Sequence, residues 1–349
     1  MKPLLIIPGF LFSTALFSGC ASPQISTSIP AAIRAQSDTR SSSLGSMIRS
    51  SAVNANLYVA NDGTEGTVTV YKDGTNALIR TITQGIGVPE SLAFDSSGNL
   101  YVANPLANNV RVYAPGRKTV QRTIHVKAPH ALLFDVAGNL YVASPKMVSV
   151  YGPGSSTPLR TITQGVKSSH ALAFDSFGNL YVANQGDHSI GTNTVTVYAP
   201  GSGSVLYSIS QGIDHPTALV TDDSNNLYVA NDFNSTVTVY TPGSSAVLRT
   251  ISADVNFPGA LLFDGVGNLY VANSGGDTVT VYAPGSKTTL RKISDGVSLP
   301  KALAFDKHGN LFVVNLRVST VTAYGPGSTT LLYTISQGVS LPTALSFSP

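Results

Sequence analysis

Apolar and polar side chains alternate in short segments along this chain, and each segment ends at turn-forming residues. The clearest segment is 278–282, Thr-Val-Thr-Val-Tyr, because β-branched and aromatic residues at period two indicate a strand. Its surroundings predict three more strands, at 258–264, 268–273 and 290–294. Pro284-Gly285 suits a tight turn, since Pro presets φ and Gly accepts a positive φ. No helical periodicity follows the first twenty residues, so the pattern predicts an all-β fold.

This four-strand unit, with strands A to D in chain order, recurs along the sequence. Asn-Leu-Tyr, or Asn-Leu-Phe in the last copy, opens strand B of every copy. Seven asparagines mark the copies: Asn56, Asn99, Asn139, Asn179, Asn226, Asn268 and Asn310. The spacings are 43, 40, 40, 47, 42 and 42 residues. Periods of this size with four strands per unit are typical of β-propellers.

The two ends of the repeat region complement each other. The first copy lacks strand A, because Asn56 directly follows a Ser-rich segment. Residues 342–347 read as a strand A with nothing after it. We therefore predict a seven-bladed β-propeller over residues 54–349, closed by a composite blade with strand A from the C-terminus and strands B to D from residues 56–83. A linear solenoid would instead carry atypical caps at both ends.

The first residues predict an export signal. Lys2 precedes an apolar run from Leu4 to Phe17, and Ser18-Gly19 are small residues before Cys20. This is the pattern of a secretory signal peptide, here over residues 1–19. The segment ending at Cys20 resembles the lipobox of bacterial lipoproteins, which implies that Cys20 carries lipid. Residues 20–53 are then a flexible tether. The expected location is the cell envelope, periplasmic or surface-facing, with the membrane reached by the lipid anchor only.

Composition narrows the function classes. Only 11% of the residues are charged, and the formal net charge is +3. Lysines and arginines are scattered singly, so no basic stripe for nucleic acid is present. The single cysteine excludes an internal disulfide framework. Neither a nucleophile-elbow, a P-loop nor a C-x-x-C motif occurs.

One motif carries a family resemblance. Residues 174–184 read Phe-Asp-x-x-Gly-Asn-Leu-Tyr-Val-Ala-Asn, and close variants recur through the repeats. The unit resembles NHL-type and YVTN repeats and the streptogramin-lyase-like (virginiamycin B lyase-like) propellers. The resemblance implies propeller architecture, and the family includes enzymes and binding modules. Within the repeats, we interpret the Asp of Phe-Asp as a turn residue and the Asn of Val-Ala-Asn as a strand-ending residue.

The lengths of the connections vary on one face. The A–B and C–D turns share one face and are uniform. The B–C loops and D–A connections share the other, which we call the variable-loop face. From the end of strand B to the Tyr of strand C the offsets are 10, 9, 7, 14, 9, 9 and 9 residues. Variable loops on a rigid scaffold are where binding usually resides. Five predicted binding residues lie there: His125, Asp187, His188, His215 and Lys301.

The residue before the strand A Ala or Ser is predicted to line the channel rim, because strand A is innermost in a propeller blade. Around the ring these residues are Glu90, His130, His170, Thr217, Gly259, Lys301 and Thr343. Three consecutive blades thus offer Glu90, His130 and His170. The group could hold a divalent metal ion, supply an acid–base pair, or simply be a polar lining of the channel. His130 and His170 match the position of the catalytic His in streptogramin lyases, but the Glu-x-His of that family has no counterpart here.

Three functions remain open from the sequence. We expect a monomeric propeller that binds an unidentified ligand or envelope protein through the variable-loop face. The alternative is a metal-dependent lyase or hydrolase with Glu90, His130 and His170 at its site. A third is a structural scaffold of the envelope. The missing nucleophile motif favours binding, whereas the clustered histidines favour an enzyme.

Overall fold

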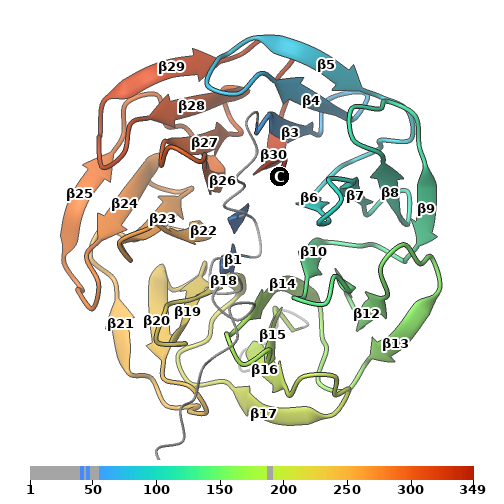
Figure 1. Cartoon of the computed structure of the whole chain (residues 1–349). Helices are drawn as coiled ribbons and strands as arrows, with labels where there is room; N and C mark the ends of the chain where they lie inside the picture. The colour runs from blue at the N-terminus through green and yellow to red at the C-terminus, as the bar shows by residue number, and fades with distance from the viewer. Residues whose placement is uncertain (1–39, 43–44, 48–54, 187–191) are drawn as a thin grey trace, which may run out of the picture. The chain divides into compact units, whose positions relative to one another are not determined.

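A computed structural model of the chain describes residues 40–42, 45–47, 55–186 and 192–349. All regular secondary structure in these ranges is β-strand. A search of the same ranges for a helix that could cross a membrane finds none. Seven four-stranded antiparallel sheets are arranged in a ring (Figure 1). The chain is a seven-bladed β-propeller, as the repeats predicted.

Each blade runs from the innermost strand A to the outermost strand D. Blade 1 comprises β30 (Pro342–Phe347), β3 (Leu57–Asn61), β4 (Thr67–Tyr71) and β5 (Leu78–Ile82). Blade 2 comprises β6 (Ser91–Phe94), β7 (Leu100–Asn104), β8 (Asn109–Tyr113) and β9 (Arg122–His125). Blade 3 comprises β10 (Ala131–Phe134), β11 (Leu140–Ser144), β12 (Met147–Tyr151) and β13 (Pro158–Ile162). Blade 4 comprises β14 (Ser169–Phe174), β15 (Leu180–Asn184), β16 (Thr194–Tyr198) and β17 (Val205–Ile209).

The remaining three blades follow the same order. Blade 5 comprises β18 (Pro216–Thr221), β19 (Leu227–Asn231), β20 (Thr236–Tyr240) and β21 (Arg249–Ile251). Blade 6 comprises β22 (Pro258–Phe263), β23 (Leu269–Asn273), β24 (Thr278–Tyr282) and β25 (Thr289–Ile293). Blade 7 comprises β26 (Pro300–Phe305), β27 (Leu311–Asn315), β28 (Thr320–Tyr324) and β29 (Leu331–Ile335). The strand limits predicted for blade 6 agree to within one residue.

Blade 1 closes the ring, and the prediction of a composite blade is confirmed. β30, from the C-terminal end of the chain, pairs with β3 in an antiparallel ladder in which Leu57 faces Phe347 and Val59 faces Leu345 (Figure 1). The closure is extended at one end by the backbone amide of Ser348, which donates to the carbonyl of Asn56. The first and last strands of the propeller therefore support each other directly.

The hydrophobic core lies between neighbouring blades. Strand B is buried along its whole length in every blade, which explains why its sequence is apolar on both faces. Aromatic pairs link most neighbouring blades edge to face. Tyr58 of blade 1 meets Phe94 of blade 2 with ring centroids 4.9 Å apart, and Tyr101 meets Phe134 of blade 3 at 5.1 Å. Such pairs add to the stabilisation that comes from burial alone.

The tyrosine that ends strand C joins its blade to the preceding D–A connection. Tyr113 donates its hydroxyl hydrogen bond to the carbonyl of Gln84 at 2.6 Å, and Tyr198 does the same to Gln164. Equivalent bonds are made by Tyr71, Tyr240, Tyr282 and Tyr324. In blade 3 the preceding connection is two residues shorter, and the hydroxyl of Tyr151 interacts instead with Ser149 of its own strand. These tyrosines are framework residues.

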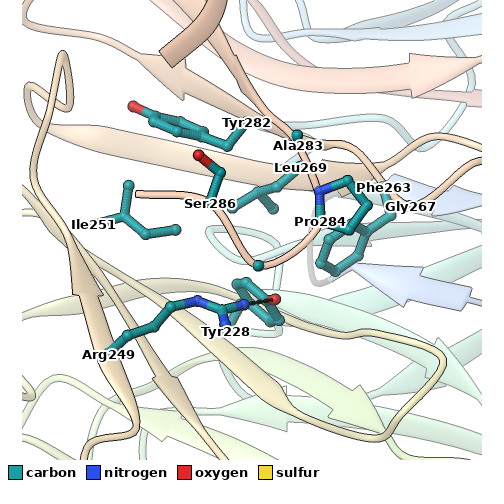
Figure 2. A pocket seen from close by; sticks show the side chains of 11 residues that line it. Tyr228, Arg249, Ile251, Phe263, Gly267, Leu269, Tyr282, Ala283, Pro284 and Ser286 are labelled. Atoms are coloured by element: carbon teal, nitrogen blue, oxygen red, sulfur yellow. Dashed lines mark hydrogen bonds between the residues drawn. The ribbon is translucent and has the colours of Figure 1, made fainter. Parts of the chain in front are cut away.

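A second link between blades involves the arginine of strand D. Arg80 donates to the hydroxyl of Tyr58 in its own blade and to the carbonyl of Gly116 in the hairpin turn of the next blade. Figure 2 shows the equivalent junction between blades 5 and 6, where Arg249 donates to Tyr228 beside the turn at Pro284. The small hollow at this junction is lined by residues of the repeat framework, so it carries no chemistry that distinguishes one blade from another.

The recurring Asp and Asn have the structural roles assigned to them. Asp95 accepts hydrogen bonds from the backbone amides of Ser97 and Asn99 in the A–B turn. Asn104, which is fully buried, donates to the carbonyl of Val102 and accepts from the amide of Gly87 in the D–A connection. Because these asparagines are buried, they fix the connections and do not line the rim.

Two short strands precede the propeller repeats in the chain and are described within the predicted tether. β1 (Arg40–Ser42) pairs antiparallel with β2 (Gly45–Met47) through three residue pairs. The signal peptide, Cys20 and the rest of the tether lie outside the described residues.

Candidate functional site

The residue at the start of strand A reaches toward the next blade. In two blades it is a threonine that bonds to the backbone of its neighbour. Thr217 donates to the carbonyl of Pro258 at 2.7 Å, and Thr343 donates to the carbonyl of Pro89 at 2.5 Å. The same position on blades 2, 3 and 4 holds Glu90, His130 and His170, whose side chains contact one another instead. This sector of the rim therefore departs from the framework.

Glu90 and His130 form a hydrogen-bonded pair. Nδ1 of His130 lies 2.6 Å from Oε2 of Glu90, and the two side chains retain 20% and 38% of their exposure. Backbone bonds hold both residues in line with their strands, because each amide continues the ladder to strand B of its own blade. An ionised carboxylate only accepts hydrogen bonds, so with Glu90 as the acceptor the proton of the bond is assigned to Nδ1 of His130. Nε2 is then the nitrogen that can accept a proton or a hydrogen bond from a ligand.

His170 completes the group by stacking on His130. The ring centroids are 4.9 Å apart and the planes differ by 13°. Burial, together with the smaller effect of the nearby His130, lowers the pKa of His170 to about 4, while Glu90 acts in the opposite direction. The imidazole is therefore neutral near pH 7. This neutral ring, beside the Glu90–His130 pair, can accept a hydrogen bond. If it took up a proton instead, a charge would be buried, which is unfavourable.

A second carboxylate–imidazole group lies further around the rim. His215 precedes β18, and its Nδ1 is 3.6 Å from Oδ2 of Asp232 in the B–C loop of blade 5. The ring also stacks on Phe233, with centroids 4.1 Å apart. Burial raises the pKa of Asp232, and His215 and Lys301 act against that shift. Lys301 is the strand A rim residue of blade 7. On blade 6, which lies between blades 5 and 7, the same rim position holds Gly259, which has no side chain.

The backbone conformation of His215 belongs to the framework. Its φ is 53°, in the left-handed region that is costly for a residue with a side chain. The equivalent residue has a positive φ in five other D–A connections, at Ala128, Ser168, Phe257, Leu299 and Leu341. The conformation thus serves the connection itself and is not a local strain that marks a site.

The other predicted binding residues divide into two groups. His125 ends β9, the outermost strand of blade 2, and is exposed, so the structure does not bring it to the rim group. Asp187 and His188 lie outside the described residues. Sequence reasoning missed Asp62 and Asp232, although both directly follow the Asn that ends strand B. Burial and the negative charge of Glu90 raise the pKa of Asp62, so this carboxyl group lies within electrostatic range of Glu90.

The described geometry does not fit the predicted metal site. Glu90 and His130 are bonded to each other, and His170 stacks on His130. Within the described ranges, no three His, Cys, Asp or Glu side chains are placed so that they could hold a metal ion together. We therefore derive no chemistry through a metal at this rim.

Comparisons with known proteins add the fold and nothing finer. No family model matches the chain, and no curated protein matches it. Solved structures do match, among them a putative 6-phosphogluconolactonase from Bacteroides fragilis. Its TM-score is 0.70 at 14% identity, covering 85% of this chain and 98% of that one. A functionally unknown protein from Desulfotomaculum acetoxidans has a TM-score of 0.69 at 14% identity, covering 84% and 98%. A protein from Lactobacillus plantarum has 0.68 at 18% identity, covering 85% and 100%. At these identities the likeness shows the propeller fold alone.

Proposed function

We propose that this protein is a lipid-anchored propeller of the cell envelope that binds a ligand or partner protein through its variable-loop face. The observation that carries the binding role is the rim sector of blades 2 to 4. There the strand A position holds Glu90, His130 and His170, which contact one another, whereas Thr217 and Thr343 bond to the backbone of the next blade. Partly exposed, prearranged polar groups on a rigid ring are what a binding site needs.

The envelope location rests on the sequence. The signal-like residues 1–19 and the lipobox-like segment ending at Cys20 support export and lipidation. The propeller repeats resemble NHL-type and streptogramin-lyase-like units, a group in which binding modules occur. The tether of residues 20–53 then gives the propeller reach from the membrane.

Site-specific photocrosslinking tests the binding role. Benzoylphenylalanine replaces Lys301 on the variable-loop face or, as a control, Lys287 in the C–D turn on the opposite face. On irradiation in membranes of the source bacterium, we expect a product of defined mass from position 301 only. The product should be lost when Glu90→Gln and His130→Asn are added. The same product from both positions, or one that the double change leaves unaltered, contradicts the proposal.

An acid–base enzyme is the second candidate. It is favoured by the bond of 2.6 Å that orients His130 and leaves its Nε2 available as a base. The lyase resemblance gives a concrete substrate to try, virginiamycin B, although Glu65 and Glu90 are followed at the family's spacing by Thr67 and Leu92. Chromatography and mass spectrometry of the full chain with this antibiotic should show a product that His130→Ala abolishes if the lyase activity is present. Unchanged antibiotic with the wild type rejects it.

A further inference from the structure

The variable-loop face is electrostatically uneven. Its described connections on blades 1, 5, 6 and 7 carry six carboxylates, namely Asp62, Glu65, Asp214, Asp232, Asp254 and Asp295, together with the ion pair between Asp277 and Arg317. The connections that flank blade 3 carry three lysines and no carboxylate. These are Lys127 in the D–A connection into blade 3, Lys146 in its B–C loop, and Lys167 in the D–A connection into blade 4. We call them the lysine cluster.

All three lysines of the cluster are exposed. Within the described part of the chain, none of them takes part in an ion pair, whereas Arg317 of the same face is bound to Asp277 at 2.6 Å. Lys292 and Lys307 likewise have carboxylate partners, Asp254 and Asp73. Because no described carboxylate pairs with these three lysines, whereas the connections of blades 1, 5, 6 and 7 carry carboxylates, the cluster gives its sector a more positive potential than those other sectors have.

Short connections bring the lysine cluster together. Lys127 and Lys167 occupy the same repeat position on consecutive blades, three residues before His130 and His170. Lys146 lies in a B–C loop of only two residues, between the ends of β11 and β12. The neighbouring Pro145 accepts a hydrogen bond of 2.5 Å from the amide of Ser168, which follows Lys167. The loop of blade 3 is thus fastened to the connection that carries Lys167.

The chemistry of the cluster indicates the kind of ligand. Lysine ammonium groups are separate point charges on flexible stems, and the fork geometry that arginine offers to a phosphate is missing from these connections. Among the described residues, the exposed Phe233 and Phe257 of this face lie on the connections around blades 5 and 6, and no exposed Phe, Tyr or Trp lies on the connections of the lysine cluster to stack on bases. Spaced single charges suit an extended chain that bears several carboxylates.

We propose that the lysine cluster docks an acidic peptide segment of a partner protein. The segment would lie across the connections of blade 3, with its carboxylates paired to Lys127, Lys146 and Lys167. His130 and His170 lie at the rim end of the same connections, and Nε2 of His130 can accept a hydrogen bond from the peptide. This inference rests on the proposed binding role of the face and names the chemistry of its partner.

Fluorescence anisotropy with a labelled peptide of about eight glutamates tests the proposal. The protein is the full chain in detergent, at about 50 mM and about 300 mM salt, since exposed charge pairs are screened as the ionic strength rises. We expect binding that weakens with salt and a glutamine peptide that does not bind. Changing all three lysines of the cluster to glutamine should weaken binding about tenfold or more, because each exposed pair contributes up to about fivefold.

The control removes the same charge from the opposite face. Lys72, Lys118 and Lys287 lie in or beside C–D turns and are also exposed. Changing all three to glutamine alters the net charge by the same amount as the change in the lysine cluster. We expect this variant to bind the glutamate peptide within about twofold of the wild type, since charges beyond a Debye length are largely screened. Equal losses in both triple variants would show that only net charge matters and would overturn the proposal.

Two further outcomes would also overturn it. If the wild type ignores the glutamate peptide, the cluster does not dock carboxylates. If a phosphoserine peptide of the same length binds and the glutamate peptide does not, the ligand is a phosphate and the assignment is wrong. Neither result removes the proposed binding role, because photocrosslinking from position 301 tests that role independently.

Discussion

Replacing His170 by glutamine should change how the stability of the propeller depends on pH. The pKa of His170 is about 4 in the folded protein, compared with 6.5 for an unperturbed histidine. Between these values the unfolded chain binds a proton that the folded protein does not. Stability from this group is therefore complete above pH 6.5 and is lost as the pH falls toward 4. His170→Gln removes the titration and should flatten this part of the profile.

The size of the effect follows from the two pKa values. Their difference corresponds to a ceiling of about 3.4 kcal/mol when the pH lies below both. Between pH 7.5 and pH 4.5, linkage gives a loss of about 2.5 kcal/mol for the wild type from this residue alone.

Urea unfolding at the two pH values measures the difference. The free energy of unfolding of the wild type should fall about 2.5 kcal/mol further than that of His170→Gln on going from pH 7.5 to pH 4.5. His308→Gln is the control, since His308 is exposed in an A–B turn on the opposite face. Parallel pH profiles for the wild type and His170→Gln would refute the placement of a buried neutral imidazole at this rim.

Three other changes test the framework and the anchor. Tyr113→Phe should lower the free energy of unfolding by about 1–2 kcal/mol, because it leaves the Gln84 carbonyl without its partner. Tyr151→Phe, at the junction without that bond, should lower it clearly less, and equal losses in urea unfolding would contradict the link. Deleting residues 342–349 removes β30 and exposes the edge of β3, so cooperative melting should be lost, and an unchanged melting curve would rule out the closure. Cys20→Ser should release the protein from the membrane fraction, and unchanged fractionation would count against lipidation.

The propeller could be predicted from the sequence because each copy repeats the same pattern of strand and turn residues. The strand B sequence occurs seven times, and the incomplete copy that begins at Asn56 is completed by the strand that begins at Pro342. Only a closed ring of seven blades accounts for both observations. The roles of the recurring Asp and Asn could also be predicted, since turn and strand-end chemistry is local. Glu90, His130 and His170 could be assigned to one rim because symmetry relates equal positions on successive blades.

The contacts within the rim could not be predicted in the same way. Symmetry places side chains on an arc but does not say whether they converge on an ion or bond to one another. Here the pairing of Glu90 with His130 and the stacking of His170 were decided by side-chain packing. His215 and Asp232 are at positions that the repeat does bring together, because the amide of Asp232 donates to the carbonyl of His215 and Ser274 makes the equivalent bond to Phe257. Only the contact between their two side chains is particular to this blade. The side-chain contacts that depart from the repeat form the proposed site, and they are also what the repeat pattern cannot predict.

The pairing of β30 with β3 also determines when the ring can close during synthesis of the chain. Of all the ladders in the propeller, this one joins residues about as far apart in the chain as the propeller allows, with Leu57 opposite Phe347. A ribosome therefore finishes nearly the whole chain before the first strand can meet its partner. Contacts between such distant residues form slowly. Until β30 has been made, the propeller is therefore an open ring in which the inner edge of β3 has no partner.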